Sequence, residues 1–508
     1  MKLRTIFYLL MLVTPFLFVS CSDKNDDDDD DDNTGPTEKT NNEITNEWIH
    51  DQMKRVYLWN DELPASPNYK QDPESFFKSI LSSKDLFSWI EKDKSKTTKS
   101  RAATGKYIGF TYLPMGYFET DETEYSSAGF FVTSVQENSD AYDKGLRRGQ
   151  IIYKVNNTEI TGENYLDLLE EGSSFTLSVY NLEGKKVTLP AISANALTDS
   201  PIVYSEVMEV NDIKIGYLVY NSFTRGTDDD GKDFTYDIEL MQTIANMGDV
   251  QEFILDLRYN PGGYLSTAID LASALVPNRS TENIFVSEKY NKYFGDSLET
   301  KFGKGIFDSY FMNVAYGTNT QIPRLNLSRL YVIATANSAS ASEAIINGLN
   351  PYFGNGAQLY HIGETTVGKD QASITVKSTN EKILWQLQPI VSRVTNSKGE
   401  GNYTNGIKPD ISASEWEECY TMVDAQYMDG TKVRVPAASP WVGGMVELGS
   451  PDEPLLAVAL EHITTGAVKD RKVKSAISTG TKKRISPLKY EGSRYKTIID
   501  EDRFKDPK

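Results

Sequence analysis

The first pattern along the chain that predicts ordered structure is a helical spacing of apolar residues. Ile49, Met53 and Val56 recur at three- or four-residue intervals, which is typical of one face of a helix. A second helix can begin at Pro73, which follows an aspartate suited to cap it. We therefore predict a small helical domain over residues 43–100.

In the next stretch, residues 104–192, apolar residues recur at every second position, which is typical of β-strands. A strand is predicted over residues 128–135, and another over residues 151–156. Between them, Gly145 can end a short helix and Gly149 can form a tight turn. This alternation of apolar and polar positions predicts a small β-rich domain.

Strands and helices alternate from residue 205 to residue 425, which predicts an α/β core. The predicted strands span residues 213–219, 252–257, 329–335 and 358–362. Two helices are predicted over residues 234–247 and 265–276, and a third follows Glu343 and ends at about Leu349. The remaining residues, 426–508, form a C-terminal extension with one predicted helix at residues 453–465 and a basic tail. The pattern assigns no role to this extension.

The N-terminus has the features of an export signal. Lys2 and Arg4 precede an apolar run that is too short to span a bilayer comfortably, and the run ends at Ser20-Cys21. A small residue before a cysteine resembles the lipobox of bacterial lipoproteins. Residues 1–20 are therefore predicted to be a signal peptide, although an ordinary signal peptide or a short anchor is the alternative. Lipidation of Cys21 would place the protein in the bacterial cell envelope, on the outer membrane, either facing the periplasm or exposed at the surface.

Charge is concentrated just behind this cysteine. The net charge is −19, from 53 basic and 72 acidic residues, and Asp26–Asp32 is an unbroken run of aspartates. Residues 21–42 should form an extended tether, because such a segment cannot build a core. A calcium loop is the weaker alternative, since the run lacks spaced ligands and a turn glycine. An acidic body argues against a nucleic-acid partner. With only two cysteines and three histidines, the chain predicts no metal site and no cofactor.

A serine cluster, Asn337-Ser-Ala-Ser-Ala-Ser-Glu343, lies where an apolar strand becomes a helix. A residue at such a junction is held rigidly near the positive end of the helix, which suits a nucleophile. Serine needs a base, and the nearest candidates along the chain are His361 and Lys369. His361 alternates within an apolar strand and is more typical of a structural histidine. Lys369 follows a glycine-rich turn, where burial would favour its neutral form.

The same turn, Gly363-x4-Gly368-Lys369, also matches the opening of a phosphate-binding P-loop. A P-loop places Ser or Thr after the lysine and continues as a helix. Here Asp370 follows, and the next residues favour a strand. The sequence therefore predicts no nucleotide partner.

Three motifs occur in order behind the β-rich domain: DLRYNPGG, NSASASE and GETTVGK. Together they resemble the carboxyl-terminal processing proteases, the tail-specific serine peptidases of family S41. The segment KGLRRGQIIYKVNNTEI resembles a PDZ domain. The resemblance implies a multidomain α/β protein with a crotonase- or Clp-like spiral ββα core, an inserted-type PDZ β-sandwich domain and a small N-terminal helical segment.

The resemblance also implies a Ser–Lys dyad in which Ser340 is the nucleophile and Lys369 the base. Two further motif positions imply an oxyanion hole, formed by the amide of Gly262 or Gly263 and by that of Ala341.

A third catalytic residue stays open. Many members place a glutamine four residues after the lysine, where this chain has Ser373. Gln371, two residues after the lysine, and Glu343, which matches a polar position linked to the dyad, are the two candidates.

The resemblance places a peptide-binding loop at Ile108, Gly109 and Phe110, where PDZ domains hold a peptide C-terminus. The alternative is that Gly109 only permits a bend in a strand. The sequence predicts a serine endopeptidase that selects polypeptides by apolar C-termini. The alternative function is a catalytically inactive PDZ scaffold on a protease fold, which the presence of both Ser340 and Lys369 disfavours.

Overall fold

The structure is a computed structural model of the full chain. It describes residues 39–93, 108–118, 127–161, 164–165, 168–169, 173–182, 185–193, 200–226, 232–327, 329–354, 358–415, 422–426, 432–436, 445–468, 484–487 and 497–499. The predicted signal peptide, Cys21, the aspartate run and Cys419 lie outside these residues. Within the described ranges, no helix combines the length and the apolar character needed to cross a bilayer.

The N-terminal domain begins with helix α1 (Asn41–Val56), a 3-10 turn (Asn60–Glu62) and helix α2 (Pro73–Ser79). Asp72 caps α2 by accepting the backbone N–H groups of Glu74 and Ser75. The domain also contains strand β1 (Trp89–Lys92), which pairs antiparallel with β20 (Trp385–Gln388). The helical prediction is therefore incomplete, since this strand ties the N-terminal domain to the core.

The β-rich domain is built around a sheet with strand order β25-β2-β3-β4-β7-β8. Its elements are β2 (Phe110–Phe118), β3 (Ser127–Val135), α4 (Asp140–Asp143), β4 (Ile151–Val155), β5 (Thr158–Glu159), β6 (Ser174–Phe175), β7 (Leu177–Tyr180), β8 (Lys186–Thr188) and β9 (Ile192–Ser193). Alternate side chains of β3 and β4, such as Phe130 and Ile152, face a common core. The outermost strand, β25 (Arg484–Pro487), comes from the far end of the chain.

The first sheet of the α/β core has strand order β10-β11-β12-β16-β17-β22, and its strands are parallel from β11 onward. The bounds are β10 (Ile202–Val210), β11 (Ile213–Tyr220), β12 (Glu252–Asp256), β16 (Leu330–Ala334), β17 (Leu359–Gly363) and β22 (Ile411–Ser412). Strands β12 and β16 are buried along their whole length, which explains their continuous apolar sequences.

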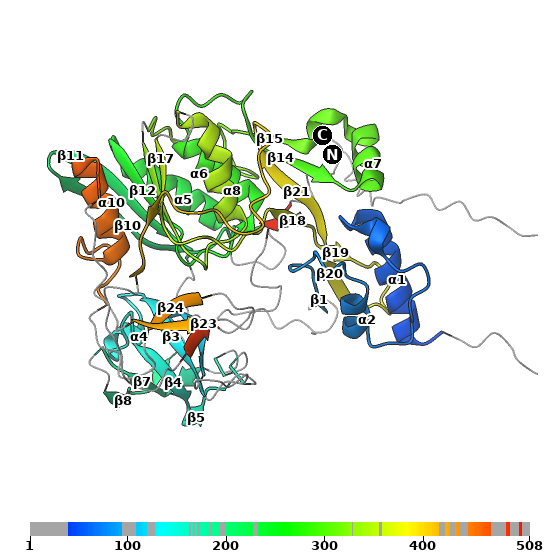
Figure 1. The fold of residues 1–508 in the computed structure, drawn as a ribbon, viewed down its shortest axis with the longest axis horizontal. Coiled ribbons are helices and arrows are strands. Elements are labelled where there is room, and N and C mark those ends of the chain that lie inside the picture. Colours follow the sequence, from blue (N-terminus) through cyan, green and yellow to red (C-terminus); the bar gives the residue numbers. More distant parts are fainter. Residues whose placement is uncertain are drawn as a thin grey trace, which may run out of the picture. The chain divides into compact units, whose positions relative to one another are not determined.

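Helices cover both faces of this sheet (Figure 1). One face packs against α5 (Thr235–Asn246), α6 (Leu265–Leu275) and α8 (Ala341–Leu349). The other face packs against α10 (Pro454–Thr465), as the shared cluster of Ile333 with Leu456 shows. Since the chain leaves β12 and β16 at the same edge of a parallel sheet, the loops that follow both strands meet there.

A second sheet of the core has strand order β13-β26-β18-β21-β14-β15. Its strands are β13 (Gly263–Tyr264), β14 (Ile284–Tyr290), β15 (Asp308–Tyr310), β18 (Gln371–Ser373), β21 (Ile390–Asn396) and β26 (Thr497–Ile498). The other elements of the described chain are α7 (Lys292–Phe302), two 3-10 turns (Lys304–Phe307 and Asn350–Tyr352), β19 (Val376–Lys377) and a hairpin of β23 (Met422–Gln426) and β24 (Lys432–Pro436).

Candidate active site

Ser340 is the N-cap of α8 and adopts φ 63° and ψ −111°, a conformation that costs a non-glycine residue free energy. Its two neighbouring serines have structural partners. The hydroxyl of Ser338 donates to the carbonyl of Leu257 at 2.7 Å, and that of Ser342 donates to the carbonyl of Asn260 at 3.0 Å. Among the described residues, the buried Oγ of Ser340 has no hydrogen-bond partner. The middle serine is therefore the one whose hydroxyl is left for chemistry.

Glu343 connects Ser340 to Lys369. Its Oε2 accepts the backbone N–H of Ser340 at 2.7 Å and that of Lys369 at 2.8 Å. Its Oε1 accepts the backbone N–H of Gly368 at 2.6 Å and the hydroxyl of Thr366 at 2.5 Å. One buried carboxylate thus holds the backbones of both predicted dyad residues through a single oxygen atom. Burial raises the pKa of Glu343 above its usual value of 4.5, and the four hydrogen bonds oppose that shift.

Lys369 precedes β18 and is only 2% exposed. Its Nζ lies 5.3 Å from the ring centroid of Phe87, a residue of the N-terminal domain. Val367 packs into the same N-terminal cluster as Phe87. The N-terminal domain therefore forms part of the lysine's surroundings, which the sequence did not indicate.

The two candidate oxyanion glycines differ in what their backbone groups do. The N–H of Gly262 donates to Oδ1 of Asn260 at 2.9 Å, so this amide is already used. Phe223 donates its N–H to the carbonyl of Gly262 and accepts the N–H of Tyr264, so neither bond uses the N–H of Gly263. Gly263 has φ 147°, and a Cβ there would lie 2.2 Å from the carbonyl oxygen of Phe223. The geometry therefore favours Gly263 over Gly262 as a donor.

Ala341 is the first residue of α8 and is fully buried. An N–H in the first turn of a helix has no partner within the helix. Ala341 thus has the second amide of the pair that the sequence predicts.

The third catalytic residue stays open between Glu343 and Gln371. Gln371 is buried, and its Oε1 has no hydrogen-bond partner within the described residues. Ser373, four residues after Lys369, accepts a hydrogen bond from Nε2 of Gln388 at 3.0 Å. Gln388 comes from β20 and was not among the predicted residues, because nothing in the sequence links it to β18.

The sequence left two alternatives to a lysine base at this turn: a P-loop that includes Lys369, and His361 as the base. Asp370 accepts a hydrogen bond from Nη1 of Arg393 at 2.8 Å, and the chain continues as strand β18 rather than as a helix. That geometry does not fit a P-loop. His361 is buried in β17 with its Nε2 3.3 Å from the carbonyl of Ala334, and burial lowers its pKa.

The sequence analysis missed a buried charge network next to the loop that carries Gly262 and Gly263. Arg258 donates to Oδ2 of Asp256 at 2.7 Å, to Oε2 of Glu415 at 3.1 Å and to Oε2 of Glu453 at 2.8 Å. Arg148, from the β-rich domain, donates to the same Glu415 oxygen at 3.0 Å. All five side chains are 0–1% exposed.

Partners so distant in sequence give no local signal. Burial alone would raise the pKa of Glu453, but Arg258 and Arg148 outweigh it and hold the pKa at about 2. The network fastens the β-rich domain and α10 to the loop that carries Gly262 and Gly263.

The predicted peptide-binding loop lies at the start of β2. Gly109 has φ 80°, and its carbonyl accepts the N–H of Gln136 at 2.9 Å. A Cβ at Gly109 would lie 2.3 Å from Cβ of Ser139. Strand β2 begins at Phe110, and Gly109 makes the bend that precedes it.

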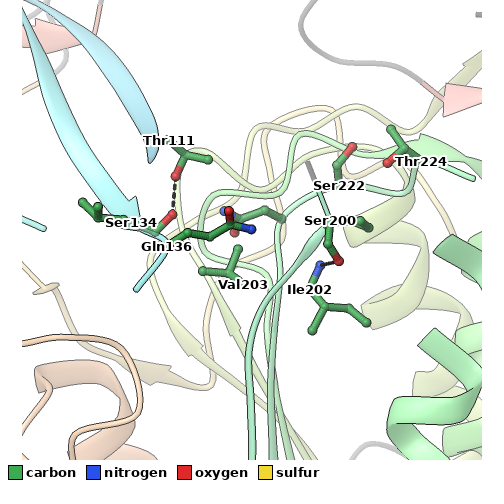
Figure 2. Close-up of a pocket in the computed structure, with 11 residues that line it drawn as sticks. Thr111, Ser134, Gln136, Ser200, Ile202, Val203, Ser222 and Thr224 are labelled. Atoms are coloured by element: carbon green, nitrogen blue, oxygen red, sulfur yellow. Dashed lines mark hydrogen bonds between the residues drawn. The ribbon is translucent and has the colours of Figure 1, made fainter. Parts of the chain in front are cut away.

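A pocket of about 220 Å³, lined by both polar and apolar residues, lies between this domain and the core (Figure 2). The β-rich domain contributes Thr111, Ser134, Val135 and Gln136, and the core contributes Ser200, Pro201, Ile202, Val203, Asn221, Ser222 and Thr224. Thr111 follows the predicted peptide loop, while Ser222 and Thr224 flank Phe223, the neighbour of Gly263. The pocket is thus lined by sequence neighbours of the predicted peptide loop and of Phe223, which pairs with Gly263.

Among the described residues, no cluster of three His, Cys, Asp or Glu could hold a metal ion. Family models match three parts of the chain: Peptidase family S41 over residues 214–413, the Peptidase S41 N-terminal domain over residues 45–89 and a PDZ domain over residues 131–181. The β-rich domain is thus a PDZ domain, as the sequence indicated.

Relatives have similar descriptions. A probable CtpA-like serine protease of Staphylococcus aureus (strain N315) is 24% identical over 68% of this chain and 61% of its own length. The carboxy-terminal processing protease CtpA of Bacillus subtilis (strain 168) is 24% identical over 58% of this chain and 55% of its own length. The chain thus spans about three fifths of these relatives.

Among solved structures, the fold resembles a crystal structure of a candidate S41 protease from Bacteroides fragilis NCTC 9343. The TM-score is 0.60 at 26% identity, over 83% of this chain and 97% of that one. This similarity confirms the predicted α/β protease fold with its PDZ domain.

Proposed function

Because the Peptidase family S41 model matches residues 214–413, we propose that the chain is a serine endopeptidase with a Ser340–Lys369 dyad. Ser340 Oγ attacks the scissile carbonyl while Lys369 Nζ takes the hydroxyl proton, and a tetrahedral oxyanion forms. Lys369 then returns the proton to the leaving amine as the C–N bond breaks, leaving an acyl-enzyme. Water, activated by the same lysine, hydrolyses the ester and restores the serine.

One observation carries this proposal most directly: the buried Glu343 carboxylate binds the backbones of both residues. The hydroxyl of Ser340 has no competing partner among the described side chains, and the side chain of Lys369 is almost fully buried. Gly263 and Ala341 would donate to the oxyanion, where each such donor is worth roughly 10²–10³ in rate.

Substrate selection would depend on the PDZ domain. We assign capture of the terminal carboxylate to the loop at Ile108, Gly109 and Phe110, since exposed backbone N–H groups in such loops bind carboxylates. We propose that the pocket lined by Thr111 and Thr224 receives the stretch of substrate between its C-terminus and the scissile bond. Its hydroxyls and amides can hydrogen-bond any backbone, so they would impose little sequence preference.

A set of peptides that share one internal cleavage sequence and differ only at the C-terminus tests both the catalytic dyad and the selection by C-terminus. The wild-type chain should cleave a peptide with an apolar C-terminus and a free carboxylate faster than its C-terminal amide. Ser340→Ala and Lys369→Ala should each lower cleavage at least about 10³-fold without changing the melting temperature. If these variants keep wild-type rates, the dyad is wrong.

A catalytically inactive PDZ scaffold is the competing function. It predicts that the wild-type chain binds peptides with a free C-terminus but cleaves none of them. Retained binding with no turnover in any peptide of the set would replace the endopeptidase proposal with this one.

We also propose that Cys21 carries the lipid that anchors the protein in the bacterial envelope, with residues 21–42 as the spacer. The support is the sequence before this cysteine and the acidic run behind it. Cys21→Ser should move the protein from the membrane fraction to the soluble fraction. An unchanged distribution would refute the anchor.

A further inference from the structure

Two short strands from the C-terminal extension, β25 and β26, pair with strands that carry or follow the residues of the proposed peptide sites. Strand β26 is inserted between β13 and β18, parallel to both. Thr497 is opposite Gly263, and Ile498 is opposite Tyr264 and Ser373. Its two neighbours are the strand that begins with the proposed oxyanion donor and the strand that follows the proposed base.

The position of β26 matters because of the direction in which the N–H of Gly263 points. On one side, Phe223 bonds to the carbonyl of Gly262 and to the N–H of Tyr264. Backbone groups of successive residues in an extended strand point to opposite sides. The N–H of Gly263 therefore points to the other side, where β26 lies. A substrate carbonyl and β26 would compete for the same donor.

The end of β26 is held firmly. The N–H of Ile499 donates to the carbonyl of Ser373 at 3.0 Å. The side chain of Ile499 is 1% exposed and belongs to the main core cluster, which also includes Ala372. An apolar residue thus fills a buried position next to β18.

Strand β25 lies at the edge of the PDZ sheet. It pairs antiparallel with β2, with Met115 opposite Pro487 and Phe118 opposite Arg484, while β3 occupies the other edge of β2. A peptide that adds a strand to β2 can do so only at the edge that β25 partly covers. The register leaves the end of β2 near Phe110 beyond the reach of β25.

We propose that the C-terminal segment carrying β25 and β26 is an autoinhibitory pseudo-substrate of this protein. Strand β26 blocks the oxyanion donor, and β25 fastens the same segment to the PDZ edge. A polypeptide bound by its C-terminus and extending along β2 would displace β25 and so weaken the hold of β26. This inference rests on the proposed peptidase function, because it assigns the regulation of that site.

Two truncations of the full chain test it. A chain ending at Lys496 lacks β26 and Ile499, whereas a control chain ending at Asp500 keeps both. If the segment is bound for about nine tenths of the time, the first truncation should raise kcat/KM for a short internal peptide about tenfold. The control should match the full chain. Equal rates for all three chains, or a loss of activity in a folded chain ending at Lys496, would overturn the proposal.

A synthetic peptide covering residues 494–503 should inhibit the shorter chain competitively, and a scrambled peptide should not. Binding of the labelled peptide to the shorter chain carrying Ser340→Ala separates the two proposals. Binding without turnover by any chain would leave the segment's role intact and refute the peptidase function. Turnover without binding would refute the segment's role alone.

Hydrogen exchange in the full-length Ser340→Ala chain covers the case in which the truncation does not fold. A saturating peptide with a free C-terminus should speed exchange at Ile498 and Ile499. Unchanged exchange at these amides under saturation would contradict displacement.

Discussion

The Glu343 carboxylate offers the sharpest perturbation of the site, because Glu343→Gln keeps its shape and changes one oxygen into a donor. The amide oxygen can stay at the position of Oε2, facing the N–H groups of Ser340 and Lys369. The amide NH₂ then faces Thr366 and Gly368. The Thr366 hydroxyl can rotate to accept, but the N–H of Gly368 loses its acceptor.

The magnitude follows from these contacts. One unsatisfied buried N–H costs about 1–3 kcal/mol. The two bonds that remain lose their charge assistance and weaken by roughly half. The strain at Ser340 is of order 1–3 kcal/mol, so the weakened bond no longer outweighs it. We expect Ser340 to relax from φ 63° and kcat to fall at least about tenfold, since 1.4 kcal/mol corresponds to a factor of ten.

Glu252→Gln is the matched control. Glu252 is also buried and pairs with Arg329, but it begins β12, at the end of the strand away from the oxyanion loop. This variant should lose stability and keep kcat. Steady-state kinetics and urea unfolding of both variants make the comparison. If kcat of Glu343→Gln stays within twofold of wild type, the carboxylate does not hold the dyad.

Three other perturbations have definite outcomes. Gly263→Ala would place a Cβ 2.2 Å from the Phe223 carbonyl and should abolish turnover, whereas Gly305→Ala, with open space around it, should leave kcat unchanged. Gly109→Ala should weaken binding of peptides with a free C-terminus, measured by fluorescence anisotropy, while cleavage of short internal peptides continues; equal losses in both assays would refute separate sites. Because the folded pKa of Glu453 is depressed to about 2 from 4.5, its stabilisation of about 3 kcal/mol is present above pH 4.5 and is lost as pH falls toward 2. Urea unfolding at pH 5 and pH 3 should show that loss in wild type and a flatter dependence in Glu453→Gln.

The parallel core could be predicted because its strands are buried on both faces and have continuous apolar sequences, as in β12 and β16. The proposed roles of Ser340 and Lys369 come from motifs that each occupy a few consecutive residues.

What could not be predicted depends on contacts between distant segments. Arg148 and Glu453 meet only after the PDZ domain and α10 have packed on the core, and no spacing in the sequence reports that. The same holds for Phe87 beside Lys369 and for Ile499 beside Ser373. Strands β25 and β26 of the basic tail have four and two residues. Such short strands contain too few apolar residues for a hydrophobic period to be recognised.

The identity of the nucleophile is the central claim, and trapping the acyl-enzyme tests it most directly. The wild-type chain is mixed with a peptide ester, quenched in acid within the first turnover and digested, and the modified fragment is located by mass spectrometry. We predict an acyl adduct on Ser340 in wild type and none in Ser340→Ala. An adduct on Ser338 or Ser342, or turnover of the ester by Ser340→Ala at the wild-type rate, would contradict the account.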